Sequence, residues 1–63
     1  MTFEITLTDQ NKEIIPQADG YELEGPLTTF FTSDGHTQRM SSWSIRLASY
    51  KTDQITSIKR LER

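Results

Sequence analysis

The sequence predicts an all-β fold of about five antiparallel strands in a meander, forming a small barrel or a strongly bent sheet. Three observations support this prediction. Apolar and polar side chains alternate over several short stretches, which is the period of a strand with one buried face. Turn signals containing glycine, proline or asparagine recur between these stretches. Only the last segment also offers a helical period, and there the two interpretations compete.

The 63 residues are predicted to form a single domain, residues 1–63, with 33% hydrophobic and 25% charged residues. Those fractions are typical of a folded chain rather than a disordered one. A core of this size contributes about 3–5 kcal/mol. The sequence contains no cysteine and one histidine, so it offers no disulfide and no thiolate zinc site. We expect no metal and no cofactor, and self-association remains an open way to stabilise the fold.

The first strand is expected near residues 3–8, where Phe3, Ile5 and Leu7 alternate with polar residues. The segment "TDQNK" follows as a turn, because Asp and Asn side chains bond to nearby backbone and tolerate left-handed conformations. A short strand in "KEIIP" must stop pairing or lie at an edge at Pro16, which has no N–H to give to a ladder.

A second alternation places Tyr21 and Leu23 opposite two glutamates, and Gly25 and Pro26 then signal a bend. The following "LTTFFT" is rich in β-branched and aromatic residues and predicts a strand. Asp-Gly in "SDGH" is a strong hairpin signal, because glycine takes a positive φ without steric cost. After it comes the longest expected strand, "TQRMSSWSIRLASY", with Trp43, Ile45 and Leu47 on one face.

The last segment, "KTDQITSIKRLER", spaces Ile55, Ile58 and Leu61 by three residues, which suits one face of a helix. Its β-branched and serine residues are poor helix formers. We therefore expect one 3₁₀ turn near residues 52–55 and a final strand over about 56–61, with Ile58 pointing inward.

This order, with a 3₁₀ turn before the final strand, resembles the layout of SH3-like small barrels. The whole chain is also similar to short uncharacterised bacterial proteins, through "ITLTD" near the N-terminus, "ADGYELEG" and "LTTFF" in the middle, and "SIKR" near the C-terminus. The resemblance spans most of the chain. It contains no motif of known chemistry and implies no activity.

Ser33, Asp34 and His36 are the residue types of a nucleophile, an orienting acid and a base. A serine nucleophile needs a base within about 3 Å that has its own orienting partner, and an oxyanion hole besides. Neighbours at the tip of a hairpin point apart into water, so we interpret them as a turn. We expect no catalytic residue and no enzyme activity.

Three acidic residues, Asp19, Glu22 and Glu24, lack the dense spacing of a calcium loop. We interpret them as a solvated strand face. No apolar run approaches the roughly 18 residues of a membrane-spanning helix, and the N-terminal segment lacks the pattern of a signal peptide. We therefore expect a cytoplasmic protein without membrane contact.

Charge is unevenly spread along the chain. Residues 1–36 contain seven acidic residues and one lysine, and residues 37–63 contain two acidic and six basic residues. One interpretation is that acidic and basic strands pair across the sheet. The other is a basic surface for nucleic acid in the C-terminal half, which the pI of about 5.2 disfavours.

The aromatic residues leave the open question that bears most on function. Phe30 and Phe31 are adjacent, so in a strand they face opposite sides, and a small barrel does not easily bury both. Either the core takes all the aromatics, or some mark a protein interface. We predict a non-enzymatic protein-interaction module that binds an unknown protein or a second copy of itself. Its candidate surface is Phe30, Trp43 and Tyr50, with Arg46 at the rim.

Overall fold

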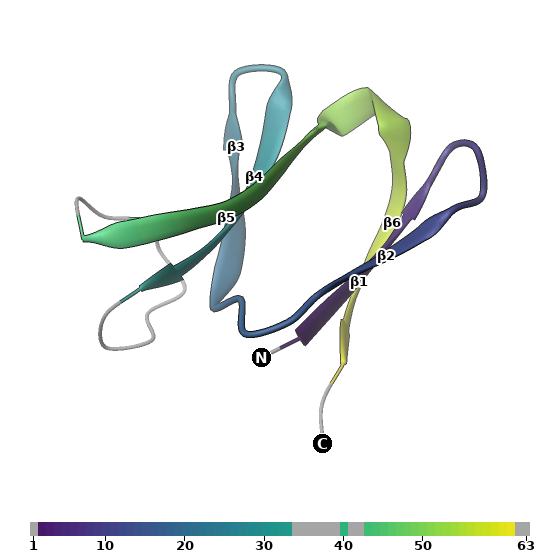
Figure 1. Ribbon diagram of the computed structural model, residues 1–63. Coiled ribbons are helices and arrows are strands. Elements are labelled where there is room, and N and C mark those ends of the chain that lie inside the picture. Colours follow the sequence, from purple (N-terminus) through teal and green to yellow (C-terminus); the bar gives the residue numbers. More distant parts are fainter. Residues whose placement is uncertain (1, 34–39, 41–42, 62–63) are drawn as a thin grey trace.

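The computed structural model describes residues 2–33, 40 and 43–61 and confirms the all-β prediction within them. Six strands are present, where about five were expected. Where the structure describes the connections, they are short turns and one 3₁₀ turn, η1 (Figure 1). The elements are β1 (Thr2–Leu7), β2 (Lys12–Ile15), β3 (Gly20–Glu24), β4 (Leu27–Ser33), β5 (Ser44–Lys51), η1 (Thr52–Gln54) and β6 (Ile55–Leu61).

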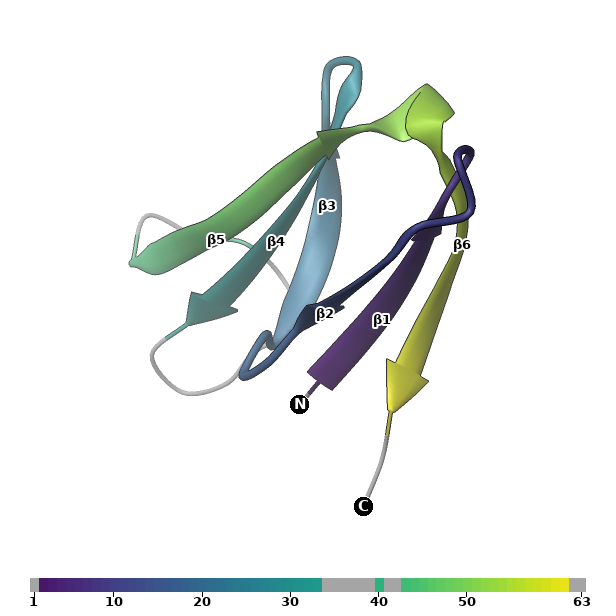
Figure 2. The same ribbon diagram turned by 45° about the vertical axis from the view of Figure 1, so that its right-hand side comes forward.

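The six strands form two three-stranded antiparallel sheets, ordered β2-β1-β6 and β3-β4-β5. The expected barrel is therefore not closed. Pro16, directly after β2, has no N–H for a ladder, and the chain then crosses to the other sheet. At η1 it crosses back. Figure 2 shows β5, β4 and β3 on one side and β2, β1 and β6 on the other.

The order of the chain differs between the two sheets. In one sheet, β3, β4 and β5 follow one another as a meander. In the other sheet, β1 lies between β2 and β6. The first and the last strand of the described chain therefore pair with each other. Thr2 lies opposite Leu61, and Ile5 lies opposite Ile58. Each sheet thus has one interior strand, β1 or β4.

The core lies between the inner faces of the two sheets. Its buried members are Phe3, Ile5, Ile15, Ala18 and Phe30. The Phe3 and Phe30 rings bring the two sheets together, with their centroids 5.6 Å apart. Half-buried Ile58 packs against this cluster from β6, as its predicted inward orientation requires. This small group of apolar side chains holds the two layers together.

Two hairpin turns use backbone conformations that few residues adopt. Gly25 has φ of +61° and is followed by Pro26, whose fixed negative φ suits the second position of such a two-residue turn. In the first hairpin, Asp9 Oδ1 accepts the Asn11 N–H at 3.0 Å, and Gln10 between them has φ of 72°. Both turns were predicted from sequence. The Asp-Gly hairpin tip predicted after β4 lies outside the described residues.

The C-terminal segment is a 3₁₀ turn followed by a strand, and not a helix. The predicted turn near residues 52–55 is η1 at Thr52–Gln54, and the strand begins one residue earlier than expected, at Ile55. Backbone hydrogen bonds fix the turn to both sheets. The Thr52 N–H donates to the Pro26 carbonyl, and the Thr8 N–H donates to the Gln54 carbonyl, each at 2.9 Å.

Candidate interaction surface

The structure corrects one of the four predicted surface residues, because Phe30 is fully buried. Its ring contacts Phe3, Tyr21 and Tyr50, with centroids 5.4–6.4 Å apart. Opposite it on β5 lies Ala48, whose small side chain leaves room for the ring. Phe30 therefore belongs to the core and does not contact solvent in a monomer.

Phe31 is also fully buried, so neither of the two adjacent phenylalanines faces solvent, although a small barrel was not expected to bury both easily. Its side chain lies on the outer face of β4, away from the core cluster. Gly20 and Arg46 are its partners across the two ladders. On the same face the backbone N–H of Met40 donates to Glu22 Oε2 at 3.0 Å. Met40 therefore lies beside Glu22 on this outer face.

A β-bulge interrupts the alternation of β5. Phe30 lies opposite Ala48, but Phe31 lies opposite Arg46, so Leu47 is the extra residue. Opposite residues share a face, and Ile45 therefore points to the same side of the sheet as Ala48 and Tyr50. The predicted alternation of Trp43, Ile45 and Leu47 along one regular strand does not hold.

The apolar residues at the start of β5 remain exposed. Trp43, which directly precedes the strand, is 80% exposed, Ile45 is 64% exposed and Leu47 is 42% exposed. Trp43 and Ile45 also line an open hollow of about 360 Å³ together with Thr32 and Ser33. These three apolar residues, Trp43, Ile45 and Leu47, are called the β5 apolar edge below. β5 is an outer strand of its sheet, as Figure 2 shows.

Of the other two predicted surface residues, Tyr50 is half-buried and packs against the core. Its burial, and secondarily the charge of Glu13, raise the pKa of the Tyr50 hydroxyl. Arg46 is exposed on the outer face of the sheet and donates to both carboxylate oxygens of Glu24. Arg46 and Tyr50 thus point to opposite faces of β5. Of the four predicted residues, only Trp43 therefore belongs to the β5 apolar edge.

The described basic residues of the C-terminal half are divided between the two sheets. Arg46 on β5 pairs with Glu24 on β3, while Lys59 on β6 lies opposite Glu4 on β1. Arg60 on β6 has its guanidinium carbon 6.0 Å from the centre of the Phe3 ring. Lys59 and Glu4 lie on neighbouring strands, and Arg46 reaches Glu24 across β4, so these placements match the interpretation in which acidic and basic charges pair across the sheet.

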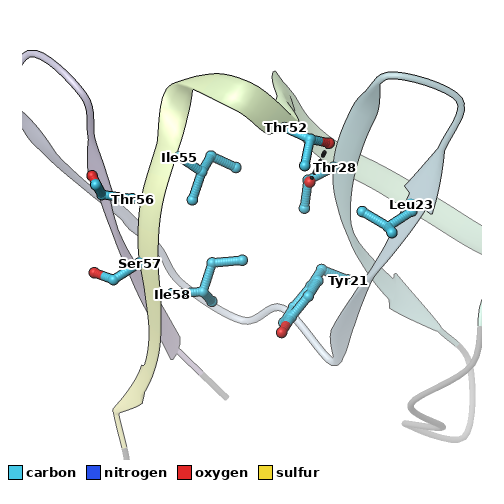
Figure 3. Close-up of a pocket in the computed structure, with 8 residues that line it drawn as sticks. All are labelled: Tyr21, Leu23, Thr28, Thr52, Ile55, Thr56, Ser57 and Ile58. Carbon is cyan, nitrogen blue, oxygen red and sulfur yellow. Dashed lines mark hydrogen bonds between the residues drawn. The ribbon is translucent and has the colours of Figure 1, made fainter.

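A second apolar opening lies between the inner faces of the sheets near η1. Figure 3 shows Ile55 and Ile58 on β6 pointing across it towards Tyr21 and Leu23 on β3. The opening measures about 320 Å³. At its upper wall the hydroxyls of Thr28 and Thr52 are 2.8 Å apart. Leu23 is 69% exposed here, because the sheets diverge and do not cover their inner faces completely.

Ser33 is the one residue of the Ser33, Asp34 and His36 group that the structure describes, and its contacts support the fold. It is buried at the end of β4, with its hydroxyl 3.3 Å from that of Ser44. Its N–H donates to Asp19 Oδ2 at 2.8 Å, and the Thr32 hydroxyl donates to the same oxygen at 2.9 Å. Asp19 therefore fixes the end of β4 and is not the solvated acid that was expected. Asp34 and His36 lie outside the described residues.

Neither a metal-binding cluster nor a membrane-spanning helix is present in the part of the chain that the structure describes. Within residues 2–33, 40 and 43–61, no cluster of three acidic or histidine side chains is arranged to hold a metal ion. The same part of the chain contains no helix with the length and apolar character needed to cross a membrane.

Comparison with protein-family models, with curated proteins and with solved structures returned no match. The resemblance to SH3-like barrels and to short bacterial proteins therefore rests on the sequence pattern alone. The fold and the surface of this chain are the basis for assigning its function.

Proposed function

We propose that this chain is a small non-enzymatic cytoplasmic protein that binds another protein through the β5 apolar edge, in an SH3-like arrangement of strands. The observation that carries the proposal is the exposure of a tryptophan, an isoleucine and a leucine at and beside one outer strand. Large apolar side chains left outside on a small domain usually mark an interaction site.

The kind of partner follows from the position of these side chains. β5 is eight residues long and has one strand neighbour, β4, among the described residues. An outer strand offers backbone donors and acceptors to an added strand, and pockets beside it select the side chains of that strand. The partner is therefore an extended segment with apolar side chains at alternate positions. The hollow lined by Trp43 and Ile45 receives one of them.

Trp43 is the only tryptophan of the chain, so its fluorescence reports directly on this surface. The test begins by capturing proteins from an extract of the source cells on the immobilised chain. Each captured protein is then purified and titrated against the chain. We expect a blue shift of the Trp43 emission on binding and at least a tenfold weaker affinity for Ile45→Lys, because a charge would be buried in the contact.

Ile14→Lys is the matched control. Ile14 is 53% exposed on β2, in the other sheet, so its substitution adds the same charge away from the proposed surface. Equal affinity of the wild-type protein and Ile45→Lys for every partner, a second copy included, would overturn the proposal, and so would the absence of any binding partner, again with a second copy counted as one. A steep loss of affinity for an oligonucleotide with rising salt would instead assign nucleic-acid binding.

A further inference from the structure

We infer that the extended segment that binds the β5 apolar edge is β5 of a second copy, so that the two β3-β4-β5 sheets join into one six-stranded sheet. This inference rests on the proposed function and names its partner. It follows from the order of inner and outer side chains along β5, which the bulge determines.

Because of the bulge, the sequence of inward- and outward-pointing side chains along β5 is the same whether the strand is followed from Ile45 or from Tyr50. Ile45, Ala48 and Tyr50 point to the inner face, and Arg46 and Ser49 point to the outer face, with Leu47 as the extra residue. Two copies related by a two-fold axis between positions 47 and 48 would pair antiparallel. Residues that face each other in such a pair must point to the same side of the sheet. A regular strand cannot meet this condition about an axis between two residues. This bulged strand meets it for residues 45 and 50, which both point inward, and for residues 46 and 49, which both point outward.

The side chains that this register brings together are compatible. Ile45 lies opposite Tyr50 of the second copy, which pairs a β-branched with an aromatic side chain on the inner face. Arg46 lies opposite Ser49 of the second copy, and no like charges face each other directly. Lys51 is the diagonal neighbour of Arg46, whose charge Glu24 already compensates within each copy.

A second copy also covers the apolar surface that the monomer leaves open. Among the described residues the core cluster has five buried members, while Trp43, Ile45 and Leu47 remain exposed. Pairing two β5 strands places Ile45 and Leu47 inside a continuous sheet. One strand pair is a small interface, so we expect monomer and dimer to exchange with concentration. The contact is apolar and made by backbone groups, so salt should have little effect on it.

The first measurement is the mass in solution by light scattering, from about 10 µM to about 1 mM, at low and at high salt. We expect the mean mass to rise towards twice that of the chain at both salt concentrations. Leu47→Lys and Ile45→Lys should each remain monomeric, and Ile14→Lys should behave as the wild-type protein. A monomeric mass of the wild-type protein over the whole range would overturn the inference.

The register is tested by cross-linking, which is simple because the natural chain contains no cysteine. Arg46→Cys and Ser49→Cys are made separately and then mixed under mild oxidation. Because residues 46 and 49 face each other only between copies, the mixture should form disulfide-linked dimers at least tenfold faster than either variant alone. Equal rates in all three samples, or faster cross-linking of one variant alone, would overturn this register.

The two proposals fail in different ways. A chain that is monomeric throughout but binds a different purified protein, with Ile45→Lys weakened, overturns the second-copy inference and supports the proposed function. A monomer whose purified partners all bind Ile45→Lys as tightly as the wild-type protein overturns both. Circular dichroism of each variant confirms that its strands are intact before these comparisons are made.

Discussion

Glu24 on β3 and Arg46 on β5 form an ion pair that reaches across β4 and joins two strands that share no ladder. The Arg46 Nη2 and Nε atoms lie 2.5 and 3.1 Å from the two carboxylate oxygens. The Thr29 hydroxyl on β4 also donates to Glu24, at 2.7 Å. Three consecutive strands of one sheet are thus linked on the outer face through a single carboxylate.

The first prediction concerns pH. Hydrogen bonds from Arg46 and Thr29 lower the pKa of Glu24 from 4.5 to about 2. Between these values the unfolded chain binds the proton and the folded chain does not, so the stabilisation is complete above about pH 4.5 and is lost as the pH falls towards 2. We expect the urea midpoint of the wild-type protein to fall more steeply over this range than that of Glu24→Gln. Parallel curves would contradict this assignment.

The second prediction separates the core from the surface. Phe30→Ala should cost about 3–5 kcal/mol, which equals what a core of this size supplies. The variant should therefore be largely unfolded by circular dichroism. Leu23→Ala, on the neighbouring strand and 69% exposed, should change the free energy of unfolding by less than about 0.5 kcal/mol. A folded Phe30→Ala protein with an unchanged urea midpoint would show that Phe30 is not a core residue.

The third prediction concerns Asp19, which accepts hydrogen bonds from the Thr32 hydroxyl and the Ser33 N–H. Asp19→Ala removes an acceptor from a buried position and should cost about 1–3 kcal/mol in urea unfolding. Asp53→Ala removes the same charge from an exposed position in η1 and should stay within about 0.5 kcal/mol. Equal effects of the two substitutions would mean that Asp19 acts only through its charge.

The fourth prediction compares two turns. An added Cβ at Gly25 would meet no atom within 4 Å, so Gly25→Ala should cost the left-handed backbone strain, about 1–2 kcal/mol. The lower entropy of the unfolded alanine chain offsets about 0.4–1 kcal/mol of this cost. Gln10 already has a positive φ. Gln10→Gly should relieve a similar strain in the folded protein. Glycine also raises the entropy of the unfolded chain, which costs about 0.4–1 kcal/mol, so we expect a net gain in thermal stability. Melting temperatures that shift in the same direction would contradict this interpretation.

Much of the fold could be predicted because the signals are local. Alternation of apolar residues predicts β1, Gly25 and Pro26 predict the turn before β4, and the β-branched C-terminal residues favour a strand over a helix. Barrel closure could not be judged in this way. It depends on whether outer strands of different sheets meet, which is decided by distant parts of the chain and not by any short segment.

The candidate surface was predicted less well, for two physical reasons. The bulge at Leu47 could not be predicted, because the apolar residues alternate regularly from Trp43 to Leu47 and this pattern indicates a regular strand. Phe31 is buried on the outer face of β4, and on that face Met40 contacts Glu22, which joins residues far apart in sequence. The alternation rule does indicate that one of the two adjacent isoleucines of β2 points away from the core, since neighbours in a strand face opposite sides, and this residue is Ile14.

The pairing of β1 with β6 has a consequence for the way the chain reaches its fold. The β3-β4-β5 meander needs only neighbouring segments to meet, and short loops close readily. The other sheet has to bring Thr2 to Leu61, and contacts of such high sequence separation slow folding. During synthesis, β1 therefore has only β2 as a neighbour until β6 has left the ribosome. Until then Ile5 lacks Ile58, its partner across the β1–β6 ladder.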